Sequence, residues 1–205
     1  MSPTSAPHDP QSMDATKAKN LDTTTNTNKQ IEDLYKLIDG IKIATFTTRA
    51  RDGSLVSRPM ATRERIEGGP DIVFVTNNQS HKLDDLSYDN HVNVAYSKGQ
   101  NWVSVSGTAS LVNDRTKIKE LYKPDLKAWF GDLGDGVHTG GPEDPRITLL
   151  YITADSVHYQ LQDKSTPTVL FEVVKGAVTG ALPETGPIRE LGTSELNHAR
   201  NIATQ

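Results

Sequence analysis

Apolar and polar residues alternate along much of the chain between residues 41 and 111, a pattern that is typical of β-strands with one buried face. The clearest strand is 102–111, where one face is apolar and the other is small and polar. That small face would let a flat ring or a partner subunit approach closely, although an ordinary solvent-facing strand has the same pattern. The alternation predicts further strands at 41–48, 55–62, 71–76 and 92–96, with Asp52-Gly53 as a hairpin signal between the first two.

Helical spacing of apolar residues predicts a helix at 28–38, which would cap one end of a barrel. Shorter helices are predicted at 79–87, 114–122 and 123–130, and the stretch 131–145 is rich enough in Gly, Pro and Asp to be a loop. Two more strands are predicted at 146–161 and 168–174. Short strands, frequent turn signals and few helices favour a mainly β (α+β) fold built as a small antiparallel barrel.

The two ends of the 205-residue chain differ from its middle in composition, and only 35% of all residues are hydrophobic. Residues 1–28 are polar with scattered apolar positions, so we expect a disordered N-terminal tail. Residues 179–205 are similar, with a faint helical pattern at 194–202, and we expect a C-terminal tail that is partly ordered at most. The alternative for both is an arm that clasps a dimer or directs targeting. The folded domain is therefore predicted to cover 29–178.

Several classes of function are disfavoured by the composition. The net charge of −4 comes without a basic block, which argues against nucleic-acid binding. No apolar run reaches membrane-spanning length and no signal or transit pattern is seen, so the cytoplasm is the expected location. The absence of cysteine excludes disulfides and thiolate metal sites. Acidic residues and a histidine between 132 and 144 match neither a calcium loop nor a zinc helix, and we expect no metal.

A candidate phosphate site lies around the predicted strand 71–76. Arg58 lies on the preceding strand, while Ser80, His81 and Lys82 follow a polar turn and begin the next helix. Backbone N–H groups at a helix start, a hydroxyl and cations together favour a dianion. The alternative is that Ser80 only caps the helix and that His81 and Lys82 are solvated.

Four short motifs carry a resemblance to a known family: Arg58-Pro59-Met60, Phe74-Val-Thr-Asn77, Ser80-x-Lys82 and Trp102-Val-Ser-Val-Ser-Gly107. In order and spacing they resemble the FMN-binding split barrels related to pyridoxamine 5′-phosphate oxidase, especially the general stress protein branch, which includes fungal members described as blue-light-inducible. The resemblance covers about residues 31–174. It implies a six-stranded antiparallel split β-barrel with Greek-key topology, short flanking helices and FMN as cofactor.

The resemblance also implies roles for individual residues. It places the FMN phosphate near Arg58, Ser80 and Lys82, and the isoalloxazine ring near Pro59, Met60, Val75 and Thr76. His81 stands where the oxidases usually carry Arg, which weakens the phosphate clamp because His is mostly uncharged at neutral pH. Split barrels form homodimers with FMN between the subunits, so Trp102 or Trp129 would flank the flavin, the alternative for Trp129 being a core anchor. Tyr159 and Gln160 are further, weaker candidates near the cofactor.

The implied function is flavin-linked oxidation or reduction of a small molecule in a stress setting. The first alternative is a module that holds or senses FMN without turnover, and the second is a barrel that uses the cleft for haem or another ligand. Oxidation of pyridoxamine phosphate itself is not expected, because the C-terminal Arg- and His-containing substrate signature of that enzyme is not matched after Tyr159. The later arginines Arg189 and Arg200 lie in the weakly patterned tail.

Overall fold

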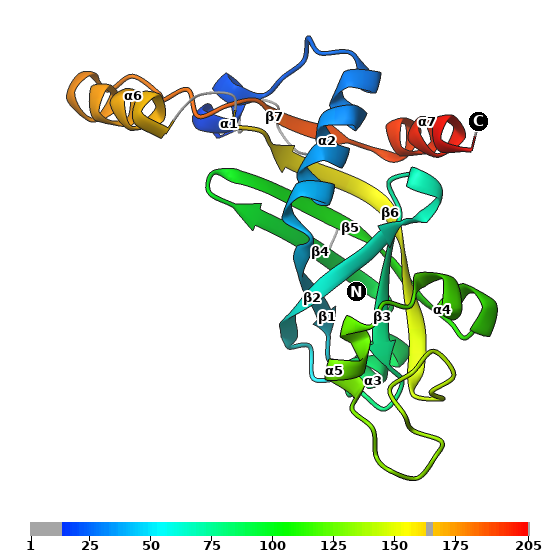
Figure 1. Cartoon of the computed structure of the whole chain (residues 1–205). Coiled ribbons are helices and arrows are strands. Elements are labelled where there is room, and N and C mark those ends of the chain that lie inside the picture. Colours follow the sequence, from blue (N-terminus) through cyan, green and yellow to red (C-terminus); the bar gives the residue numbers. More distant parts are fainter. Residues whose placement is uncertain (1–13, 163–165, 205) are drawn as a thin grey trace, which may run out of the picture.

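Six antiparallel strands close into a barrel in the computed structural model, which describes residues 14–162 and 166–204 (Figure 1). The strands are β1 (Ile43–Arg49), β2 (Leu55–Arg65), β3 (Ile72–Asn77), β4 (His91–Lys98), β5 (Asn101–Val112) and β6 (Ile147–Gln160). Their order is β3-β2-β1-β4-β5-β6, and a β3–β6 pairing closes the sheet. Because β4 returns beside β1 after the β1-β2-β3 meander, the topology is a Greek key. The predicted split barrel is confirmed.

Alternating burial explains why these segments form strands. In β1 the even-numbered residues from Ala44 to Thr48 are buried and face the core. The turn to β2 is the predicted hairpin, where Gly53 has a φ of +87° and the Asp52 carboxylate accepts the Ser54 N–H at 2.9 Å. Glycine is needed there because other residues rarely adopt a positive φ.

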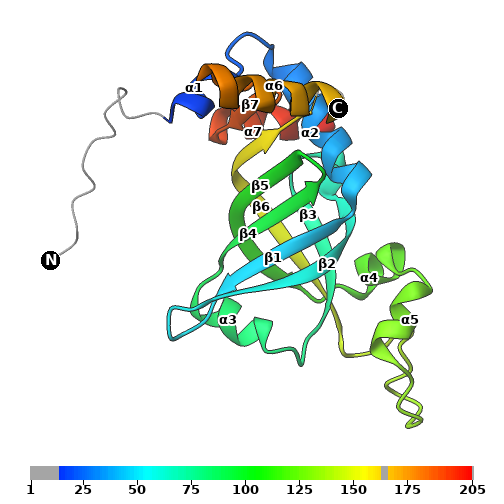
Figure 2. The ribbon, with the colours of Figure 1, turned by 90° about the vertical axis from the view of Figure 1, so that its left-hand side faces the viewer.

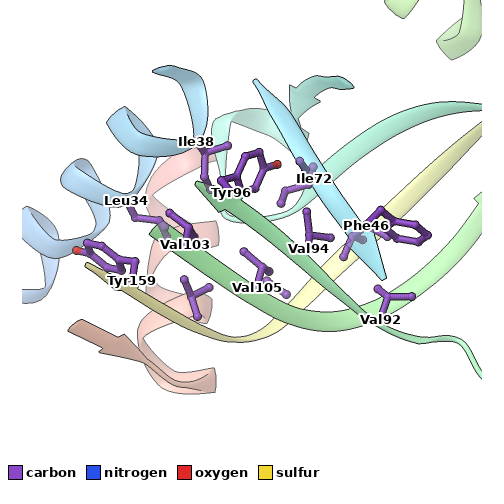
Figure 3. Packing of buried hydrophobic residues seen from close by; sticks show 14 of the residues in the cluster. Leu34, Ile38, Phe46, Ile72, Val92, Val94, Tyr96, Val103, Val105 and Tyr159 are labelled. Carbon is purple, nitrogen blue, oxygen red and sulfur yellow. The ribbon is translucent and has the colours of Figure 1, made fainter. Parts of the chain in front are cut away.

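The barrel interior is filled by side chains from β1, β3, β4, β5 and β6, together with those of the helix that covers one end of the barrel (Figure 3). Phe46 and Phe74 are fully buried and meet edge to face at 5.9 Å between ring centroids. Gly107 lies where the β5–β6 register shifts, and a Cβ at this position would lie 2.2 Å from the carbonyl oxygen of Thr153. The close approach of β6 therefore requires glycine.

Helices cover both ends of the barrel (Figure 2). The predicted helix at 28–38 is confirmed as α2 (Thr27–Ile41), which buries Ile31, Leu34 and Ile38 against the core. The three short helices are confirmed as α3 (Lys82–Tyr88), α4 (Arg115–Leu121) and α5 (Asp125–Phe130). A short N-terminal helix α1 (Ala15–Asn20) and a 3-10 turn η2 (Ile66–Gly68) complete this part of the fold.

The strand predicted at 168–174 is wrong, because this segment lies within helix α6 (Thr166–Thr179). Its β-branched residues favour a strand, but its boundaries favour a helix. Pro167 lies in the first turn, where its missing N–H costs nothing, and Gly180 follows the last turn with a φ of +70°. The Gly180 N–H donates to the Gly176 carbonyl at 2.8 Å and closes the helix.

The C-terminal stretch, expected to be a tail, carries two further elements. Strand β7 (Ile188–Leu191) pairs with the end of β6, and α7 (Thr193–Ala203) buries Leu196 and Ala199. Arg189 is buried in β7 and donates to Asp22 at 2.8 Å and Asp33 at 2.7 Å, which ties β7 to the segment before α2 and to α2 itself. Of the expected N-terminal tail, residues 1–13 lie outside the described residues, and the rest contains α1, a connecting segment at 21–26 and the start of α2.

Within 14–162 and 166–204, no helix combines the length and the apolar character that crossing a membrane requires.

Candidate functional site

A cavity of about 350 Å³ opens between β2, β3 and α5, and several of the predicted site residues line it. From β2 come Pro59 and Met60, from β3 come Val75 and Thr76, and Lys82 begins α3. The remaining lining residues are Ile43, Ala61, Arg63, Asn77, Asp125, Leu126, Trp129 and Phe130. The fold thus gathers residues from three of the four predicted motifs around one cavity.

Lys82 is the main electropositive group of this cavity. Its ammonium Nζ donates to the Thr76 hydroxyl at 2.7 Å, and Thr76 is buried. Burial, and after it the nearby charge of Arg58, lower the pKa of Lys82 below its usual value. Among the residues that the structure describes, Lys82 has no carboxylate partner within ion-pair distance. A partly buried cation without an acidic partner favours an anionic ligand.

Arg58 lies beside this cavity rather than in its lining, and its guanidinium is held by two side chains. Nη1 donates to the buried Thr48 hydroxyl at 2.8 Å, and Nη2 donates to Asp85 Oδ2 at 3.3 Å. Thr48 in turn donates to the same Asp85 oxygen at 2.7 Å. The sequence analysis missed Thr48 and Asp85, since neither belongs to a motif and only the β1–β2 and β1–α3 packing brings them to Arg58.

Ser80 and His81 occupy the turn between β3 and α3. The Ser80 N–H donates to the Asn77 carbonyl at 3.1 Å and its own carbonyl accepts from Leu83, but its hydroxyl does not cap the helix, because the N-cap position is His81. The alternative role of Ser80 as N-cap is therefore wrong. The His81 side chain is fully exposed, with Nδ1 3.4 Å from Asp84, and it does not line the cavity.

The two tryptophans lie in different places. Trp129 is 84% exposed and forms part of the cavity wall, so the alternative of a core anchor is wrong. Trp102 lies opposite Gln160 at the far end of β6 and donates from Nε1 to the Gln160 side chain at 2.9 Å, whereas Thr76 pairs near the start of β6. One chain therefore does not bring Trp102 to the cavity. Tyr159 is a core residue whose hydroxyl donates to the Gln30 carbonyl.

The α5 wall of the cavity is fixed at both of its ends. Arg63, whose side chain is 9% exposed, donates two parallel hydrogen bonds to Asp125 at 3.1 and 3.0 Å. At the other end, Arg146 donates to the carbonyls of Phe130 and Gly131 at 2.9 and 2.8 Å. Two arginines thus hold the segment that carries Trp129 against the barrel.

A second cavity, of about 370 Å³, lies on the other side of Arg63 between α2 and β2. Its lining is charged and includes Asp39, Lys42, Arg65 and Lys123. Apart from Arg63 it shares no residue with the first cavity and contains none of the predicted site residues, so the first cavity is the candidate site.

A closed six-stranded antiparallel barrel capped by short helices defines the class of protein as a split barrel. A family model described as pyridoxamine 5′-phosphate oxidase like matches residues 29–184. The chain belongs to this family. It is 41% identical over 191 residues to Protein bli-3 of Neurospora crassa, with 92% of this chain and 91% of that protein covered.

Solved structures show the same fold. General stress protein 26 of Bacillus anthracis matches with a TM-score of 0.54 at 24% identity, over 63% of this chain and 92% of that one. A protein described as a general stress FMN/FAD binding protein, from Xanthomonas citri, matches with a TM-score of 0.54 at 23% identity, over 67% of this chain and 92% of that one. At this level of identity the likeness concerns the fold alone.

Proposed function

We propose that the chain binds FMN in the cavity between β2, β3 and α5, with the phosphate near Lys82 and Arg58 and the ring along Met60 and Val75. The observation that carries this proposal is Lys82, a partly buried cation without a carboxylate partner among the described residues, beside a largely apolar cavity. The cavity volume lies within the range of small-ligand pockets. The Xanthomonas citri relative, described as FMN/FAD binding, supports the same ligand class.

The residues present fit such a ligand. Met60 and Val75 offer apolar surface to a flat ring, and the Thr76 hydroxyl holds the ammonium of Lys82 beside it. Arg58 supplies a guanidinium whose orientation Thr48 fixes. When bound, a flavin supplies electron and hydride transfer, while the protein supplies position and electrostatics. We propose flavin-linked oxidation or reduction of a small molecule in a stress response, in line with the general stress relatives.

A non-catalytic FMN-binding module is the second candidate function, and the ionisable residues that line the cavity support it. The ionisable side chains of this lining are Arg63, Lys82 and Asp125, and two of these form an ion pair with each other. The lining therefore offers no evident pair of proton donor and acceptor. Rapid reduction of bound FMN by NADH or NADPH in a stopped-flow experiment, followed by reoxidation with turnover, is expected for the enzyme. Flavin that stays oxidised would favour the module.

We further propose a homodimer in which the second copy covers the cavity. Trp129 leaves 84% of its surface in solvent on the cavity wall, where a partner subunit would bury it. Trp102 lies near the start of β5, opposite the end of β6 and away from the cavity of its own chain, so it would approach the flavin only from the partner.

An FMN titration followed by flavin fluorescence tests the binding proposal. Arg58→Ala and Lys82→Ala together are expected to weaken FMN binding by more than about 2 kcal/mol, roughly 30-fold, because each removes a charge-assisted contact. The charge-matched control is Arg51→Ala with Lys98→Ala, since both residues are exposed and neither lines the cavity. Riboflavin lacks the phosphate, so the same double substitution at Arg58 and Lys82 should reduce its affinity much less than that of FMN. Equal FMN affinity in both double variants would rule out this phosphate site.

A further inference from the structure

The second cavity, of about 370 Å³, is lined mainly by charged side chains, unlike the first. It lies between the end of α2, the strand β2 and the segment that joins α4 to α5. Four cations line it against two carboxylates, so its lining carries a net charge of +2 in a chain of net charge −4. The cations are Lys42, Arg63, Arg65 and Lys123, and the carboxylates are Asp39 and Glu64. A cavity of this volume accommodates a small ligand, and its charge favours an anion.

The two arginines of this lining already have carboxylate partners. Arg65 donates two hydrogen bonds of 2.9 Å to Asp39, and Arg63 donates its two parallel hydrogen bonds to Asp125. The Arg65 side chain is 15% exposed and that of Arg63 is 9% exposed, so both guanidiniums are held in place. Because both forks are engaged, neither arginine is open to bidentate recognition of a further carboxylate.

The two lysines of the lining are in a different situation. Within 14–162 and 166–204, neither Lys42 nor Lys123 has a carboxylate partner within ion-pair distance, since Asp39 pairs with Arg65. The other carboxylate, Glu64, also lines a neighbouring cavity that contains Lys117. Lysine acts as a compact point charge and is a common ligand of phosphate, whereas the planar fork of arginine suits a carboxylate. The cations that remain open in this cavity therefore favour a phosphate group.

The backbone of Lys42 gives an independent reason to expect a ligand here. Its φ is +65° and its ψ is −37°, a conformation that residues other than glycine rarely adopt. Two hydrogen bonds hold it, because the Lys42 N–H donates to the Ile38 carbonyl at 3.2 Å and the Lys42 carbonyl accepts the Thr62 N–H at 2.8 Å. Glycine would end the helix here without strain. Strained residues of this kind are concentrated at ligand clamps and active sites, where the surrounding contacts enforce them.

We propose that the second cavity binds a small phosphorylated molecule, with Lys42 and Lys123 as the ligands of its phosphate. This site is separate from the phosphate site proposed for FMN, because neither Arg58 nor Lys82 lines the second cavity. A nucleic-acid backbone is a poor match, since its recognition needs a larger cluster of cations than two open lysines. The inference does not rest on the proposed function.

Isothermal titration calorimetry of the full chain with inorganic pyrophosphate tests this site, both without FMN and with saturating FMN. Lys42→Gly combined with Lys123→Gln is expected to raise the dissociation constant for pyrophosphate by about tenfold or more, because two charge-assisted contacts are lost. The charge-matched control is Lys98→Gln with Lys127→Gln, which should leave the constant nearly unchanged, since both lysines are exposed and neither lines the cavity. Equal affinity in the two double variants would overturn the proposal. So would binding that FMN abolishes and the Lys42 and Lys123 substitutions leave intact, because the anion would then lie in the first cavity.

Two further measurements separate ligand binding from a structural role and phosphate from carboxylate. Lys42→Gly removes the ammonium together with the backbone strain, so its Tm is expected to equal or exceed that of the wild type while pyrophosphate binding weakens. A Tm that falls together with the affinity would mean that Lys42 acts through the fold and would overturn its role as a ligand. Malonate, a dicarboxylate of similar charge, is expected to bind several-fold more weakly than inorganic phosphate. Equal affinity for the two anions would overturn the assignment to phosphate.

Discussion

Replacing Asp144 by Asn tests whether one buried ion pair holds the α5 wall of the candidate site. Asp144 is fully buried, and its carboxylate accepts from the Arg146 side chain at 2.7 and 3.0 Å and from the Gly140 N–H at 2.7 Å. Arg146 donates in turn to the carbonyls of Phe130 and Gly131 at the end of α5. The substitution keeps the shape of the side chain and removes its charge.

The size of the effect follows from the pKa of Asp144. The hydrogen bond from Arg146 lowers this pKa from 3.8 to about 2, which corresponds to about 2 kcal/mol of stability at neutral pH. Asn also leaves the Arg146 guanidinium buried without its counter-charge, and breaking a buried pair costs about 3–5 kcal/mol. We therefore expect Asp144→Asn to lower the free energy of unfolding at pH 7 by about 2–5 kcal/mol, the range that these two estimates span.

Urea unfolding followed by circular dichroism measures this loss, with Asp132→Asn as control, because Asp132 is exposed and accepts a local backbone N–H from Gly134. Since the folded pKa of Asp144 is depressed, its contribution is complete above about pH 4 and is lost as pH falls towards 2. The difference between Asp144→Asn and the wild type should shrink over that range. A difference below about 0.5 kcal/mol at pH 7, with no faster proteolysis of the loop after α5, would refute the reasoning.

Three further predictions concern other parts of the molecule. Burial lowers the pKa of Lys82. FMN affinity should therefore fall as pH rises from 7 towards 10.5, because this cation loses its proton. An FMN titration in which Lys82→Ala shows the same pH dependence as the wild type would contradict this. Arg189→Met leaves Asp22 without its buried partner and should lower the free energy of unfolding in urea by about 3–5 kcal/mol. An unchanged unfolding midpoint would argue against a stabilising role of this ion pair. Gly107→Ala forces a methyl group against the Thr153 carbonyl and should cost about 1–3 kcal/mol; a thermal melt like that of the wild type would contradict the close strand approach.

The sequence predicted the barrel strands well because each has one face in the core. In β1 and β5, residues that point inward are apolar or small, and a period of two follows directly from the pleat. Helix α2 was predictable for the corresponding reason, since Ile31, Leu34 and Ile38 recur at helical spacing and are buried. Periodicity succeeds wherever a segment packs against the chain's own core.

Helix α6 was not predictable in this way, because its most apolar side chains do not face its own core. A run of valines with Leu170 and Phe171 resembles a buried strand when only composition is considered. The useful signals were Pro167 at the start and Gly180 after the end, which fit a helix with a terminating glycine. Strand β7 was not predicted, for another reason. Four residues are too few for alternation to be recognised, and the aspartates that pair with Arg189 are distant in sequence.

Six of the predicted site residues line the candidate cavity, namely Pro59, Met60, Val75, Thr76, Lys82 and Trp129, but the charges around them could not be predicted. Spacing places Arg58 and Lys82 near each other, as two equal cations for a phosphate. In the structure Asp85 lies 3.3 Å from the guanidinium of Arg58, whereas Lys82 has a neutral partner, the Thr76 hydroxyl. The net charge of the two cations and Asp85 is therefore +1. Because Arg58 already interacts with a carboxylate, an incoming phosphate gains most from Lys82, and Arg58 contributes mainly through the fixed direction of its remaining donors.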